Sequence, residues 1–253
     1  MRYSAVILAA VSLGLVCGCA GAPEKESLET KNIEFSEITP LQEGAPYNFT
    51  MEMQIEWPEG GTDSKAIKQM QKGITDLLFG SELKTIDIEY AMNAYNSRSV
   101  DFYRQNNEEY LEDTEDEWSP LTNWSESING SFLDEYDGMV SYIKYVHGYS
   151  GGAHGMDALT CRTFDLKTGE QILEEDLFKE GYEDKLTAAL RTNLLSSIED
   201  QDMLFETDII PSNDFYLTPE GITYIYQRYE IGPYAIGIIE VTVPWSEIKD
   251  IIR

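Results

Sequence analysis

The stretch "YNFTMEMQIEWP", residues 47–58, alternates apolar and polar side chains without interruption. Side chains in a β-strand point to opposite faces in turn, so this period of two predicts a strand with one buried and one wet face. That pattern is typical of an antiparallel sheet packed on one side only. The apolar face would carry Tyr47, Phe49, Met51, Met53, Ile55 and Trp57, and Pro58 would end the strand.

The hydrophobic period changes from two to that of a helix directly after this strand. In residues 62–80 an apolar stripe follows a capping residue, Asp63 or Ser64, and ends at Gly80. A second stripe runs through Ile88, Ala91, Met92, Tyr95, Ser99, Phe102 and Tyr103. We expect these two helices to cover the apolar face of a sheet.

The second half of the chain predicts hairpins around one more long helix. Strand-like runs lie on both sides of Asp137-Gly138, of the turn at 167–169 and of the turn at 219–221. Residues 182–198 have a helical stripe, and a final strand within 234–244 precedes a short helix. The predicted fold class is therefore α+β, with antiparallel β-sheets packed against a few helices in two related or intimately packed subdomains.

The first residues predict export and lipidation. A basic start is followed by the apolar run "AVILAAVSLGLV" and then by "CGCAG", an order typical of a bacterial secretory signal. Small and aliphatic residues before Cys19 resemble a lipoprotein processing site, so we predict a signal peptide at 1–19 and acylation of Cys19. An ordinary cleaved signal is the alternative. Residues 20–44 are predicted to be a flexible tether, in which Ile33, Phe35 and Ile38 would at most add a short edge strand.

Composition narrows the classes of partner. The chain has 46 Asp and Glu against 18 Lys and Arg, a formal net charge of -28. Nucleic acid binding needs basic patches, so it is not expected. A basic partner would be attracted, unless the acidity only keeps the protein soluble. Cys161 is predicted to be a small buried residue, with a catalytic thiol as the alternative.

Two aromatic, glycine-containing segments are the candidates for partner binding. The first is "YSGGAHG", with Tyr149, Gly151, Gly152 and His154; it is either a strand connection or a ligand loop. The second is "RYEIGPYAIG", with Tyr229 and Tyr234, either an aromatic binding surface or a packed hairpin corner. The sequence contains no G-x-S-x-G, no C-x-x-C and no phosphate-binding glycine loop. We predict no catalytic residue, no metal site and no cofactor.

The ordered series "YSGGAHG", "TFDLKTGE", "EEDLF" and "FYLTPEGITYIYQRYEIGPYAIGIIEVTVPWSEI" resembles a known pair of extracytoplasmic domains of unknown function. The pair occurs in RsiV-type anti-sigma factors, which bind lysozyme, and in PdaC-type peptidoglycan deacetylases. This resemblance implies an N-terminal α+β domain at 45–148 and a C-terminal RsiV-like domain at 149–253. The sigma-binding part, the membrane span and the deacetylase H-x-x-x-H motif are not found in this sequence.

The resemblance implies an extracytoplasmic protein, lipid-anchored to the bacterial cell membrane at the outer membrane or the periplasmic face, that binds or senses a macromolecule. The expected partners are the lipid membrane through acylated Cys19 and either a basic lysozyme-like protein or a peptidoglycan-related glycan. The alternative function is an envelope glycan-modifying enzyme that uses His154 and a carboxylate as acid and base.

Overall fold

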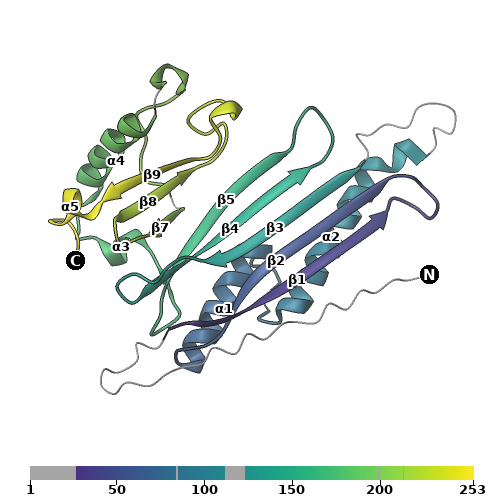
Figure 1. Cartoon of the computed structure of the whole chain (residues 1–253), viewed down its shortest axis with the longest axis horizontal. Helices are drawn as coiled ribbons and strands as arrows, with labels where there is room; N and C mark the ends of the chain where they lie inside the picture. Colours follow the sequence, from purple (N-terminus) through teal and green to yellow (C-terminus); the bar gives the residue numbers. More distant parts are fainter. Residues whose placement is uncertain (1–26, 84, 112–122, 199, 213) are drawn as a thin grey trace, which may run out of the picture.

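The computed structural model describes residues 27–83, 85–111, 123–198, 200–212 and 214–253. The predicted signal peptide and Cys19 lie outside these residues. Within them, a six-stranded sheet and a three-stranded sheet each pack against helices, which confirms the α+β class (Figure 1).

The six-stranded sheet follows the order of the sequence. It contains β1 (Glu29–Pro40), β2 (Asn48–Gly60), β3 (Trp124–Phe132), β4 (Met139–Tyr149), β5 (Met156–Asp165) and β6 (Gln171–Ile172). The helices α1 (Ser64–Phe79) and α2 (Ile88–Asn107), with the 3-10 turn η1 (Glu108–Leu111), connect β2 to β3 and cover one face of the sheet (Figure 1).

The alternating strand predicted from residues 47–58 is β2. Phe49, Met51, Met53, Ile55 and Trp57 are all buried in the core between sheet and helices. The Asp63 side chain caps α1 by accepting a hydrogen bond from the Lys65 amide, and Gly80 ends the helix at φ 93°. The predicted strand and the predicted first helix are therefore confirmed, but Pro58 does not end the strand, which continues in its pairing with β1 to Gly60.

One strand pair departs from the expected antiparallel arrangement. β2 and β3 are parallel, with Phe49 opposite Trp124 and Ile55 opposite Gly130. The connection between them contains both helices, and a strand that returns through such a crossover lies parallel to the one before it. The sheet is therefore mixed.

The prediction of a flexible tether at 20–44 is wrong for residues 27–44, the part that the structure describes. Residues 29–40 form β1, which pairs with β2 over its whole length. Only Ile33 and Phe35 of this strand pack against the core, while Ile38 on the other face is 66% exposed. The amphipathic pattern is weak because β1 is an edge strand, and its backbone pairing with β2 determines its structure.

The domain boundary predicted between residues 148 and 149 does not separate two sheets. It falls at the end of β4, which forms a hairpin with β5 inside the six-stranded sheet. Consecutive strands joined by a short loop normally pair, and residues 150–155 are such a loop. The chain leaves the first sheet only after β6, and "EEDLF" forms the short helix α3 (Glu174–Leu177) rather than a strand.

The three-stranded sheet contains β7 (Phe215–Leu217), β8 (Gly221–Tyr226) and β9 (Ile239–Pro244). Around it lie α4 (Glu183–Ser197), α5 (Trp245–Ile248) and the 3-10 turns η3 (Gln201–Met203) and η4 (Tyr234–Ile236). Its core is separate from the first and includes Leu186, Leu190 and Leu194 of α4, all with no exposed surface.

The two sheets meet where β7 packs against β4 and β5. The Ser141 hydroxyl lies 2.8 Å from that of Thr163 and accepts the Leu217 amide at 3.1 Å. Cys161 is 4% exposed, and its thiol donates to the Phe215 carbonyl at 2.9 Å. Burial raises the pKa of this thiol, so the prediction of a buried structural cysteine is confirmed. Among the described residues, no helix has the length and apolar composition needed to cross a bilayer.

Candidate functional site

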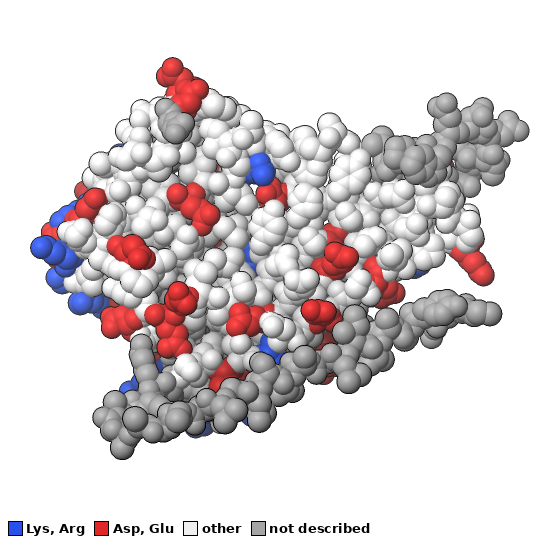
Figure 2. All heavy atoms as spheres, viewed as in Figure 1, with Lys and Arg blue, Asp and Glu red and all other residues white. Residues whose placement is uncertain are grey.

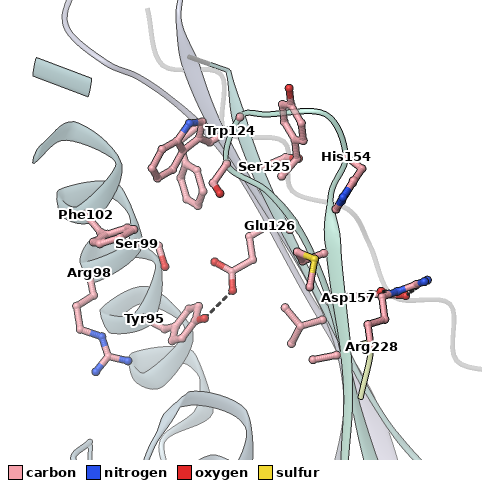
Figure 3. A pocket seen from close by; sticks show the side chains of 18 of the residues that line it. Tyr95, Arg98, Ser99, Phe102, Trp124, Ser125, Glu126, His154, Asp157 and Arg228 are labelled. Carbon is pink, nitrogen blue, oxygen red and sulfur yellow. Dashed lines mark hydrogen bonds and ion pairs between the residues drawn. The ribbon is translucent and has the colours of Figure 1, made fainter. Parts of the chain in front are cut away.

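A cleft of about 790 Å³ opens between α2 and the strands β3 to β5. One wall is the exposed side of α2, and the floor is the helix-facing side of the sheet (Figure 3). The loop 150–155 between β4 and β5 borders it. The lining includes five aromatic residues: Phe49, Tyr95, Phe102, Trp124 and Tyr149.

The polar centre of the cleft is a hydrogen bond between its wall and its floor. The Tyr95 hydroxyl on α2 donates to Glu126 Oε1 on β3 at 2.6 Å (Figure 3). Burial and the negative charge of Glu126 raise the pKa of Tyr95, so this hydroxyl stays a neutral donor at physiological pH. One carboxylate oxygen of Glu126 is thereby fixed, and the group is held in place inside the cleft.

Two basic side chains lie near this pair, and both are held by the protein. The Lys144 ammonium on β4 donates to the Leu77 carbonyl at the end of α1, at 3.2 Å. Burial lowers the pKa of Lys144, and the charge of Glu126 opposes that shift. Arg98 forms an ion pair with Glu82, and its guanidinium lies 5.5 Å from the Tyr95 ring centroid.

The glycine loop at the border of the cleft is folded by its own contacts. Gly151 and Gly152 have φ of 90° and 92°, a region that other residues rarely adopt. The Tyr149 hydroxyl donates to the Gly152 carbonyl at 3.0 Å. The loop conformation therefore explains why glycine occupies positions 151 and 152. Three residues of this segment, Tyr149, Gly151 and His154, also line the cleft.

The structure brings the two segments singled out in the sequence together. The His154 ring stacks on Tyr234 with centroids 4.0 Å apart, and Tyr229 lies 5.8 Å from Tyr234. The Tyr234 hydroxyl donates to the Gly155 carbonyl at 3.0 Å. Tyr229 is half exposed and has φ 65°, and a bulky residue in this left-handed region is uncommon. Among the glycine candidates, Gly152 has no atom within 4 Å of the position where a Cβ would lie.

An ion pair between the two sheets lies behind this cluster. Arg228 after β8 binds both carboxylate oxygens of Asp157 on β5. The Arg228 guanidinium also lies 4.4 Å from the Tyr234 ring centroid. The hydrogen bond and the positive charge of Arg228 hold the pKa of Asp157 below its usual range, although burial acts in the opposite direction. Figure 3 shows Asp157 and Arg228 on the side of the strands away from Glu126.

Both histidines of the sequence lie against Gly155. His154 Nδ1 is 2.9 Å from the Gly155 carbonyl oxygen, and a Cβ on Gly155 would lie 2.8 Å from His147 Cε1. Asp157 pairs with His147 across the strands, but its carboxylate is occupied by Arg228. In the parts of the chain that the structure describes, no three His, Cys, Asp or Glu side chains are grouped to hold a metal ion.

Sequence patterns identified the loop that borders the cleft, with Tyr149, Gly151 and His154, but not its wall and floor. Tyr95 and Phe102 lie on the apolar stripe of the second predicted helix and were expected in the core. Phe102 is instead 60% exposed and lines the cleft. Glu126 is one of many acidic residues, and only the fold places it opposite Tyr95.

Comparison with known proteins gives a family match for part of the chain. Residues 175–246 match the family model described as "Protein of unknown function (DUF3298)". The DUF3298 match extends from α3 through the three-stranded sheet to the start of α5. No curated protein matches the chain.

Solved structures of DUF3298 proteins resemble the whole described fold. A member of the family from Bacteroides fragilis has 24% sequence identity and a TM-score of 0.80, with 90% of this chain and 95% of that chain covered. A DUF3298 family protein from Pseudomonas aeruginosa has 18% identity and a TM-score of 0.65, with 90% and 96% covered. At these identities the likeness establishes the fold, which includes the six-stranded sheet outside the DUF3298 match.

Proposed function

We propose that this protein is a lipid-anchored envelope protein that binds a peptidoglycan-related glycan in the cleft between α2 and β3–β5. The observation that carries the proposal is the combination of aromatic side chains with a fixed carboxylate, Glu126, in one open cleft. A sugar ring has apolar C–H faces and a rim of hydroxyls. Aromatic rings accept the faces, and a carboxylate accepts hydrogen bonds from the rim.

The location outside the cytoplasm rests on the signal-like N-terminus, on Cys19, and on the resemblance to RsiV and PdaC. In those proteins the corresponding domains are outside the cytoplasm, and one relative type acts on peptidoglycan. Mass spectrometry of the purified N-terminus tests this part, since an unmodified cysteine or an intact signal would contradict lipidation.

We favour binding over catalysis because the groups near His154 are already engaged. Asp157 is the carboxylate nearest in sequence to His154, and Arg228 neutralises it. Its lowered pKa makes it a poor proton donor at neutral pH. If wild-type protein released fragments from cell-wall glycan and His154→Ala did not, the enzyme alternative would replace the binding proposal.

Removing an aromatic wall of the cleft should weaken glycan binding. We expect Phe102→Ala to raise the Kd for a tetramer of N-acetylglucosamine about tenfold, because the loss of one stacking surface amounts to roughly 1–1.5 kcal/mol. Calorimetric titration of a soluble form beginning at residue 27 measures the effect. Phe205→Ala is the matched control, because Phe205 is 66% exposed, outside the cleft lining. Equal affinity for both variants, or no binding by wild type, would reject the proposal.

A basic lysozyme-like protein is the second candidate partner, and the charge distribution favours it. Figure 2 shows acidic side chains spread over the face in view, while the basic ones gather mainly at the end that carries the C-terminus. An acidic surface accelerates encounter with a cationic protein, and salt screens this attraction. We expect any complex with a cationic lysozyme to weaken at least tenfold between 50 and 200 mM salt. Undetectable binding at both concentrations would exclude this partner class.

A further inference from the structure

The position of Glu126 in the cleft affects which sugars can bind there. This inference rests on the proposed glycan-binding function. We propose that Glu126 is a specificity-determining residue that selects neutral sugar rings and rejects sugars that carry a carboxylate. The Glu126 carboxylate lies in a cleft whose lining also includes the aromatic rings of Phe49, Phe102 and Trp124.

The orientation of Glu126 is fixed before a ligand arrives. Oε1 accepts from Tyr95 at 2.6 Å, so the carboxylate can turn away only if this bond breaks. Oε2 then remains to accept hydrogen bonds from the hydroxyls of a ligand, which are donors. A ligand carboxylate has no proton to offer at neutral pH, and the like charge of Glu126 repels it.

Cationic sugars are disfavoured for a different reason. Arg98 lines the cleft, and Lys144 lies close enough for its pKa to respond to Glu126. Glu82 forms an ion pair with Arg98, and the charge of Lys144 offsets that of Glu126, so an added cation gains little net attraction. The lining also includes the hydroxyls of Ser99, Ser125 and Ser150, which are compatible with a neutral, hydroxyl-rich ring. The charged lining residues Asp157 and Arg228 are paired with each other.

Three tetrasaccharides that differ in charge test the inference at 150 mM salt. The probes are a neutral N-acetylglucosamine tetramer, its deacetylated cationic form, and an acidic tetramer in which N-acetylglucosamine alternates with glucuronate. Wild type should bind the neutral tetramer most tightly. Glu126→Gln should weaken the neutral tetramer about tenfold, since a charged acceptor forms the stronger hydrogen bond. It should strengthen the acidic tetramer about tenfold as the like charge is removed.

Tyr95→Phe provides the matched variant, because it removes the hydrogen bond and leaves the charge of Glu126. Discrimination against the acidic tetramer should therefore persist in Tyr95→Phe and disappear in Glu126→Gln, with both variants checked by their melting temperatures. An unchanged ratio of neutral to acidic affinity in Glu126→Gln would overturn the inference and leave glycan binding intact. So would preferential binding of the cationic tetramer by wild type. If wild type bound none of the three, the proposed function itself would fail.

Discussion

Gly169→Ala should lower the free energy of unfolding by about 3 kcal/mol. Gly169 ends the turn between β5 and β6 with φ 72°, and an added Cβ would lie 2.0 Å from the Ala66 carbonyl oxygen in α1. A left-handed alanine costs about 1–2 kcal/mol, and forced overpacking adds about 1–3 kcal/mol. Because the obstacle is helix backbone, the turn must move away from α1. Chemical denaturation of both proteins measures the change.

Gly138→Ala separates the two causes of this effect. Gly138 has φ 75°, close to that of Gly169, but no atom lies within 4 Å of its Cβ position. We therefore expect a loss of only about 1 kcal/mol, from the backbone conformation alone. Equal losses for the two variants would show that the contact between the β5–β6 turn and α1 contributes nothing. The Thr62 hydroxyl, which donates to the Leu166 carbonyl at 2.7 Å, belongs to the same contact.

Arg228→Ala should destabilise the protein by about 3 kcal/mol through the contact between the two sheets. The side chains of Arg228 and Asp157 are 19% and 11% exposed, so removing the guanidinium leaves a largely buried carboxylate without its partner. The stacking of Arg228 on Tyr234 is lost as well. Lys31→Ala is the control, because its ion pair with Glu59 is about half exposed and should contribute less than about 1 kcal/mol.

The effect of Arg228→Ala should depend on pH in a defined direction. Arg228 lowers the pKa of Asp157 in the folded protein below its unfolded value. A lowered folded pKa stabilises the fold fully above the unfolded pKa of about 4, and this contribution is lost as pH falls toward the folded pKa. The difference between wild type and variant should therefore be largest near pH 7 and narrow below about pH 4. A difference that grew in acid would contradict the assignment of the ion pair.

Local pattern predicted the elements of this fold with few errors. The alternation in residues 47–58 produced β2, and the cap at Asp63 and the end at Gly80 bounded α1. The Asp137-Gly138 signal corresponds to a turn in which both residues have positive φ. These features depend on residues within a few positions of one another, so the sequence carries the information directly.

Edge strand β1 and the parallel pairing of β2 with β3 were not predictable in this way. β1 buries little side-chain surface, and its structure depends on backbone hydrogen bonds to a strand that follows it. The partner of β2 on its other side is β3, which the chain reaches only after two helices. The packing of the whole sheet determines which strand lies beside β2. The hydrophobic period of either strand carries no information about that choice.

The sequence by itself determined the α+β class, the strongly acidic character, and the identity of the aromatic and glycine-rich segments. The tertiary structure alone decided that Tyr95 meets Glu126 across 31 positions and that Asp157 meets Arg228 across 71. It also placed His154 against Tyr234. The physical reason is that periodicity and turn chemistry act over a few residues, whereas contacts between distant side chains arise from the packing of helices on sheets and of one sheet on another.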